Sequence, residues 1–103
     1  MIDLIQNKTT ELNDICEKHL VKSLHLFGSA TNNKFKPSES DLDFVVEFKT
    51  ELAPIDFADN FFSLMDELKN LFQKEIDLLS SRALKNQVII SEIEETKVQL
   101  YAA

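Results

Sequence analysis

The feature that most constrains the fold of this chain is the alternation of short apolar segments with one long amphipathic segment. The long segment begins near Pro54, a residue that suits the first turn of a helix, and extends to about Phe72. Residues 23–27, 42–48 and 74–79 are short and apolar, which is typical of strands. Because helices and strands alternate, the sequence predicts an α+β fold of two layers. In it, a small mixed sheet of three or four strands packs with helices in the order α-β-α-β-α-β-α.

Other segments predict shorter elements. These are a helix at 2–18, a turn with one helical turn at 28–35, a loop at 36–40 and a short helix at 82–85. A capping box of Ser91 and Glu94 predicts a last helix that ends near Ala102. One face of the long helix is expected to hold Ala58, Phe61, Phe62, Met65, Leu68 and Phe72. Its aromatic residues are interpreted as core, with a partner surface as the alternative: Phe57, Phe61, Phe62 and Phe72.

Length and charge limit the function. At 103 residues, the chain is expected to form one domain over residues 1–103. Its formal net charge of -7 argues against wrapping duplex nucleic acid, which needs a surplus of Lys and Arg. The lone Cys16 fits a reducing compartment, and neither a signal peptide nor a membrane-spanning segment is visible. We therefore expect a cytoplasmic protein that does not enter membranes, and a homo-oligomer remains possible.

Acidic residues interrupt two of the predicted strands. Asp41 and Asp43 are two residues apart at the start of the strand at 42–48, so their side chains would share one face. Asp43 lies in an apolar segment where an unpaired charge is costly, and Asp77 lies in the next strand in a similar way. If the two strands are neighbours, three carboxylates converge. Carboxylate oxygens are ligands that Mg²⁺ prefers. The alternative is that these are solvated acids of an acidic chain.

The only glycine of the sequence precedes these acids. Gly28 and Ser29 follow the strand at 23–27 and open the next turn. A glycine lets a phosphate approach the backbone closely, and amide groups at the start of a helix attract anions. The alternative is an ordinary strand-to-helix turn. Together with the acids, the turn predicts a site for a nucleoside triphosphate and its magnesium ions.

The segment Leu26-Phe27-Gly28-Ser29, followed by a polar loop and Ser40-Asp41-Leu42-Asp43, resembles the signature of the minimal nucleotidyltransferases of the DNA polymerase beta superfamily. Asp77 in "EIDLLS" is placed like the third carboxylate of this family. The tail "IISEIEETKVQLY" resembles its closing helix. The resemblance covers nearly the whole chain.

This resemblance implies transfer of a nucleoside monophosphate, AMP from ATP, to a hydroxyl. It assigns two Mg²⁺ ions and catalysis to Asp41, Asp43 and Asp77, and it assigns the nucleotide to Gly28, Ser29, Lys34 and Ser40. The implied acceptor is a tyrosine of a small helical HEPN-type toxin, for which such proteins serve as antitoxins. Nothing in the sequence resembles a separate acceptor-binding domain, which favours a protein acceptor.

Two departures from the family pattern keep other functions open. The loop from Ala30 to Ser40 is one residue longer than usual, and the arginines that often follow the Gly-Ser pair are replaced by Ala30, Thr31 and Asn32. Lys34 and Lys36 are expected either to substitute in part, without the bidentate geometry of arginine, or to be solvated lysines of the loop. The alternatives are an antitoxin that only caps a helical partner, and the catalytic subunit of an aminoglycoside-type nucleotidyltransferase.

Overall fold

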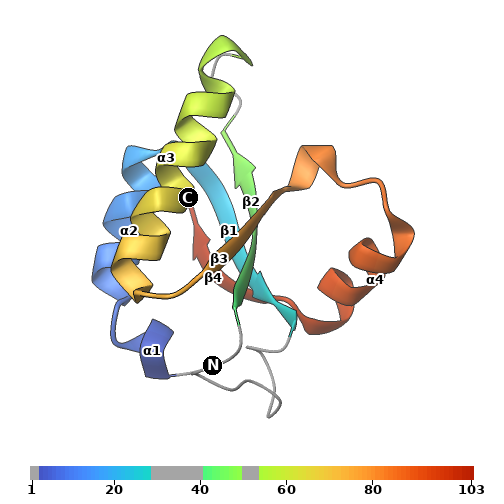
Figure 1. The fold of residues 1–103 in the computed structure, drawn as a ribbon, viewed down its shortest axis with the longest axis horizontal. Helices are drawn as coiled ribbons and strands as arrows, with labels where there is room; N and C mark the ends of the chain where they lie inside the picture. Colours follow the sequence, from blue (N-terminus) through green and yellow to red (C-terminus); the bar gives the residue numbers. More distant parts are fainter. Residues whose placement is uncertain (1–2, 29–40, 50–53) are drawn as a thin grey trace.

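One mixed sheet is formed by the described residues of the computed structural model, which are 3–28, 41–49 and 54–103. Its strand order is β3-β2-β1-β4 (Figure 1). The strands are β1 (Val21–Phe27), β2 (Leu42–Phe48), β3 (Ile76–Ser80) and β4 (Val98–Ala102). Strand β1 is antiparallel to both β2 and β4, whereas β2 and β3 are parallel. The predicted α+β fold with a small mixed sheet is confirmed.

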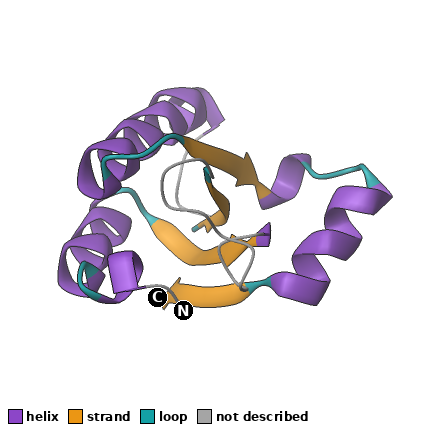
Figure 2. Cartoon of the chain, turned by 60° about the horizontal axis from the view of Figure 1, so that its bottom comes forward, coloured by secondary structure: helices purple, strands orange, loops and turns teal. Residues whose placement is uncertain are grey.

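Helices cover both faces of this sheet. They are α1 (Asp3–Gln6), α2 (Thr9–Lys18), α3 (Pro54–Phe72), the short 3₁₀ helix η2 (Ser81–Ala83) and α4 (Gln87–Thr96). Helices α1, α2 and α3 lie on one side of the sheet and α4 lies on the other, as Figures 1 and 2 show. In the part of the chain that the structure describes, no helix has the length and apolar character needed to cross a membrane.

The strict alternation of β2 explains the two faces. Leu42, Phe44 and Val46 are fully buried in the main core, which also contains Leu64 and Leu68 of α3. Residues between them point the other way, because successive side chains of a strand alternate. A second, smaller cluster on that face contains Phe27, Val45 and Ile93, with Leu79, Leu84 and Ile89 packed against it. This cluster holds α4 on the sheet.

The first helix differs from the prediction. Instead of one helix over 2–18, α1 and α2 are separate, and the backbone of Lys8 leaves the helical region with φ -119°. The hydroxyl of Thr9 donates to the carbonyl of Gln6 at 3.0 Å, which gives the backbone a local alternative to a continuous helix. Strand β1 then begins at Val21, after Leu20 turns the chain with φ 58°.

The prediction for the C-terminal segment was wrong. Helix α4 begins after Asn86, whose side-chain oxygen accepts from the amides of Val88 at 2.9 Å and Ile89 at 3.4 Å. This is an N-cap, and it replaces the predicted capping box at Ser91. The helix ends at Thr96, and residues 98–102 form β4 beside β1. The short helix predicted at 82–85 is η2, displaced by one residue toward the N-terminus.

The long helix was predicted with the correct bounds and a partly wrong face. Its most buried residues are Leu64, Leu68 and Phe72, and the ring of Phe72 stacks on that of Phe44 at 5.9 Å between centroids. Phe57, Phe61 and Met65 pack partly against the same core. Phe62 was assigned to the core face together with Ala58, but its side chain is 56% exposed and Ala58 is exposed as well. Successive residues of a helix point in different directions, so Phe62 is exposed although the neighbouring Phe61 packs against the core.

Candidate active site

Asp43 and Asp77 lie side by side on the face of the sheet that α4 covers. They are partners in the parallel register of β2 and β3, so their side chains leave the sheet in the same direction. Asp43 is half-buried and Asp77 is exposed. The sequence predicted that three carboxylates converge if the two strands are neighbours. Strands β2 and β3 are neighbours, and they bring Asp43 and Asp77 together.

The pKa of Asp43 is raised from 3.8 to about 6. Burial is the largest cause, because it disfavours the charged form. The negative charge of Asp77 and a side-chain hydrogen bond with it come next, and Glu92 and Asp41 raise the pKa further. Each of these influences would be relieved by a cation, so the carboxylate pair offers a place for one.

Asp41 lies directly before β2 and is exposed. Its charge raises the pKa of Asp43, so it lies near that residue. Because Asp41 is outside β2, the strand does not fix the direction of its side chain. Among residues 3–28, 41–49 and 54–103, no three His, Cys, Asp or Glu side chains are placed to hold a metal together. Mg²⁺ commonly binds one or two carboxylates and completes its shell with water and phosphate oxygens, so Asp43 and Asp77 are the donors that fit it best.

Gly28 directly follows β1 and lies close to Asp43. Its φ of 77° is a conformation that residues with a side chain rarely adopt. A Cβ atom there would lie 2.9 Å from Oδ2 of Asp43 and 3.5 Å from Oε1 of Glu92. The glycine is therefore needed to leave room for the Asp43 carboxylate. The amide of Gly28 donates to Oγ1 of Thr96 at 2.9 Å, so it is already engaged with α4.

Three residues assigned to the nucleotide, Ser29, Lys34 and Ser40, lie outside the described residues. The predicted turn and loop between Gly28 and Asp41 lie outside them too. These assignments stay predictions.

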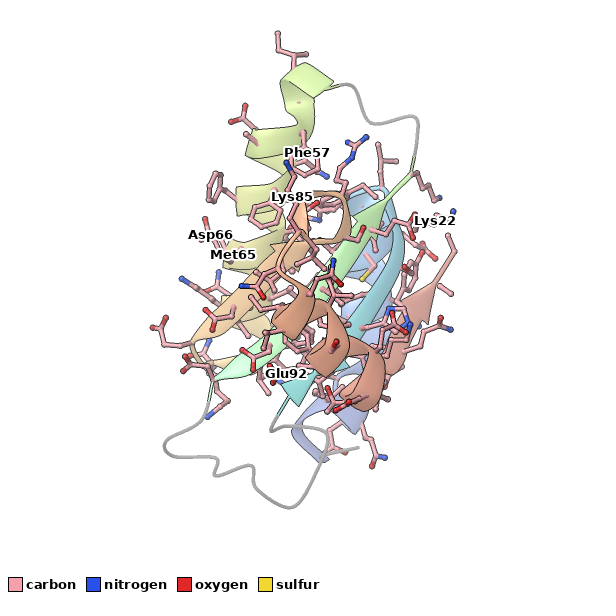
Figure 3. All side chains as sticks on the ribbon, turned by 90° about the vertical axis from the view of Figure 1, so that its right-hand side faces the viewer. Lys22, Phe57, Met65, Asp66, Lys85 and Glu92 are labelled. Carbon is pink, nitrogen blue, oxygen red and sulfur yellow. The ribbon has the colours of Figure 1, made fainter. Side chains whose placement is uncertain are left out.

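A cavity of about 440 Å³ opens beside the acid pair. Asp43, Asp77 and Glu92 supply its polar lining, and the apolar lining comes from both the sheet and α4: Phe27, Leu78, Leu79 and Ile89. Figure 3 shows Glu92 on α4, on the side of the sheet that this helix covers. The cavity combines an acidic end with apolar walls, which suits a ligand that has a flat apolar part and a polar group.

Glu92 and Thr96 were not recognised as site residues in the sequence. With the true bounds of α4, Ile89 and Ile93 mark the helix face that packs on the sheet, and Glu92 lies beside them. A spacing of three to four residues from these isoleucines is the signal that could have found Glu92 and Thr96.

The profile of the family described as "Polymerase beta, Nucleotidyltransferase" matches residues 10–103. The chain belongs to this family. It is accordingly a nucleotidyltransferase, as the resemblance in the sequence implied.

Curated and solved relatives agree with this assignment. The chain is 39% identical over 79 residues to "Putative protein adenylyltransferase MJ0128" of Methanocaldococcus jannaschii, which covers 77% of this chain and 76% of the relative. The fold matches the structure of a tri-AMPylated Shewanella oneidensis HEPN toxin in complex with its MNT antitoxin, with a TM-score of 0.64 and 19% identity. That match covers 96% of this chain and 73% of the other. A toxin–antitoxin structure with AMP-PNP matches with a TM-score of 0.66 and 20% identity, over 99% and 75% of the two chains.

Proposed function

We propose that this nucleotidyltransferase transfers AMP from ATP to a tyrosine hydroxyl of a small helical HEPN-type protein, and so acts as an antitoxin in the cytoplasm. The observation that carries the proposal is the Asp43–Asp77 pair at the edge of the cavity. Two acids held together against their mutual repulsion are typical of a site that receives a cation and a phosphate.

Asp43 and Asp77 would hold Mg²⁺, and the resemblance to the family adds Asp41 as a third ligand and a second ion. Bound there, the metal would supply charge neutralisation for the triphosphate and the leaving pyrophosphate. The donor set supports this choice, because all the candidate ligands are carboxylates and Mg²⁺ prefers oxygen. The raised pKa of Asp43 supports it as well, since that carboxyl lacks a compensating charge among the groups that shift it.

The remaining roles follow from position. Asp77 is the more exposed acid and borders the cavity, so it is placed to accept the proton of an entering hydroxyl. That hydroxyl oxygen would bond to the α-phosphorus while the bond to pyrophosphate breaks. The apolar walls at Phe27, Leu79 and Ile89 would hold the ring of the acceptor. Gly28, Ser29, Lys34 and Ser40 would hold the nucleotide.

Two observations support a protein acceptor. The relative from Methanocaldococcus jannaschii is named "Putative protein adenylyltransferase MJ0128", and one fold neighbour was solved with an AMPylated HEPN toxin. The net charge of -7 would also assist association with a basic, nucleic-acid-directed partner, because complementary charge speeds encounter and sets orientation.

Intact-mass spectrometry of a small helical HEPN-type protein from the same genome tests the proposal. The partner is incubated with ATP, Mg²⁺ and either the wild type, Asp43→Asn or Asp77→Asn. Nucleotide mass should appear only with the wild type. Asp66→Asn, an exposed acid of α3, serves as the matched control and should transfer normally.

Other results would redirect the proposal. Tight binding of the partner without added mass would leave a capping module. No binding at all would point to a small-molecule acceptor. Normal transfer by Asp43→Asn or Asp77→Asn would show that the assigned role of that acid is wrong.

A further inference from the structure

Thr96 joins Gly28 to α4 through two hydrogen bonds. Its hydroxyl donates to the carbonyl of Glu92 at 2.7 Å and accepts from the amide of Gly28 at 2.9 Å. A hydroxyl has a single proton, and the carbonyl of Glu92, four residues earlier in the helix, takes it. A lone pair of the same oxygen is then left to face Gly28, so the helix itself fixes the hydroxyl as an acceptor.

The backbone that Thr96 holds lies close to the Asp43 carboxylate. A single added carbon on Gly28 would come within 2.9 Å of the Asp43 carboxylate. A small displacement of Gly28 therefore changes the space around Asp43 directly. Glu92, whose carbonyl receives the Thr96 proton, also lines the cavity with its side chain. Thr96 thus connects Gly28, which lies close to Asp43, with Glu92 on the α4 side of the cavity.

We propose that Thr96 is a positioning residue of the active site, whose hydroxyl fixes Gly28 against the Asp43 carboxylate and so preorganises Gly28 and Asp43 for a nucleoside triphosphate. This inference rests on the proposed nucleotide site. It assigns Thr96 no contact with the substrate, because its oxygen is directed to two backbone groups. A threonine that only stabilised α4 would need the bond to Glu92 and not the bond to Gly28.

Thr96→Val removes the hydroxyl and keeps the shape, and Thr96→Ser keeps the hydroxyl. Thr10→Val, at an exposed position of α2 across the sheet, is the matched control. Because the chain has a single glycine, selective ¹⁵N-glycine labelling gives one amide resonance, that of Gly28. Its hydrogen exchange reports the bond to Thr96 without any nucleotide. Calorimetry with the non-hydrolysable analogue α,β-methylene-ATP and Mg²⁺ measures the affinity of the proposed nucleotide site for this analogue.

In Thr96→Val we expect exchange of the Gly28 amide to accelerate and affinity for the analogue to fall, each by about tenfold, the effect of losing one hydrogen bond. Thr96→Ser and Thr10→Val should behave like the wild type in both measurements. Unchanged exchange in Thr96→Val would overturn the inference. Faster exchange with unchanged affinity would overturn it too, because Thr96 would then be structural only. If the wild type binds no analogue while its Gly28 amide is protected, the proposed nucleotide site itself fails, and the positioning role with it.

Discussion

Asp43 and Asp77 occupy one register pair of the parallel strands β2 and β3, with the half-buried acid beside the exposed one. The core on the opposite face imposes this pairing. The preceding pair, Leu42 and Ile76, is buried there, and a slip of either strand by one residue would move the acid of that strand into the core. The same alternation that forms the fold therefore places two carboxylates together.

Replacement of Asp43 by Asn should stabilise the metal-free protein at neutral pH. The folded pKa of Asp43, about 6, lies above the ordinary value of 3.8, so folding favours the protonated acid. Its stabilising contribution is fully present below about pH 4 and is lost as the pH rises through about 6. Because Asp43 is half-exposed, solvent screening limits the gain in the variant to about 1 kcal/mol at pH 7.5. This corresponds to a rise in Tm of roughly 4–8 °C.

Thermal unfolding in excess chelator checks this expectation. Asp43→Asn should melt above the wild type at pH 7.5 and close to it at pH 4, where both side chains are neutral. Asp66→Asn, on the exposed face of α3, controls for the loss of one negative charge. A difference in Tm that does not change with pH would contradict the raised pKa.

Binding of ATP should depend strongly on Mg²⁺. The described part of the site is lined by Asp43, Asp77 and Glu92, which repel a triphosphate unless a cation intervenes. Calorimetry should show that the affinity for ATP falls at least about tenfold when the metal is chelated. The free energy that this loss represents is smaller than one charge-assisted interaction can contribute. Asp77→Asn should reduce this dependence, whereas Glu95→Gln, an exposed acid elsewhere on α4, should keep it. Equal affinity with and without chelator would argue against a metal-centred site.

The sequence predicted those elements whose pattern is local. Strand β2 and helix α3 were found with their bounds, because the alternation of residues 42–48 and the start at Pro54 do not depend on distant contacts. Strand β4 was missed for the opposite reason. Residues 98–102 follow α4 without a glycine or proline, and the extended backbone of Lys97, with ψ 140°, is set by pairing with β1. Five residues with mixed apolar content fit either state until a partner strand decides.

The residues of the site also differ in whether the sequence alone could predict them. Asp43 and Asp77 could be predicted, because each interrupts an apolar strand. Glu92 and Thr96 were missed, since their spacing from Ile89 and Ile93 identifies them only when the bounds of α4 and its packing over the sheet are known. Gly28 was expected to offer its amide to a phosphate, but the structure explains the glycine by the close approach of Asp43.

The two faces of α3 should differ sharply in their effect on stability. Leu64 is fully buried, so Leu64→Ala should lower the free energy of unfolding by about 2–5 kcal/mol. Phe62 is 56% exposed, and Phe62→Ala should cost less than about 1 kcal/mol, although it removes more carbon atoms. Urea unfolding of both variants measures the difference. A larger loss for Phe62→Ala would mean that this ring packs in the core, as the sequence pattern suggested.

Gly28→Ala should destabilise the protein through two separable effects. The positive φ of 77° costs a residue with a side chain about 1–2 kcal/mol, and the added Cβ meets the Asp43 carboxylate at 2.9 Å. Removing that carboxylate relieves only the second effect. We therefore expect Gly28→Ala to cost less in an Asp43→Ala background than in the wild type, with a coupling of about 0.5–3 kcal/mol in a double-mutant cycle. Urea unfolding of the four proteins at pH 7.5 in chelator gives this coupling directly. Strictly additive losses would mean that glycine is required at this position only for its positive φ, and that the close approach of Asp43 does not affect stability.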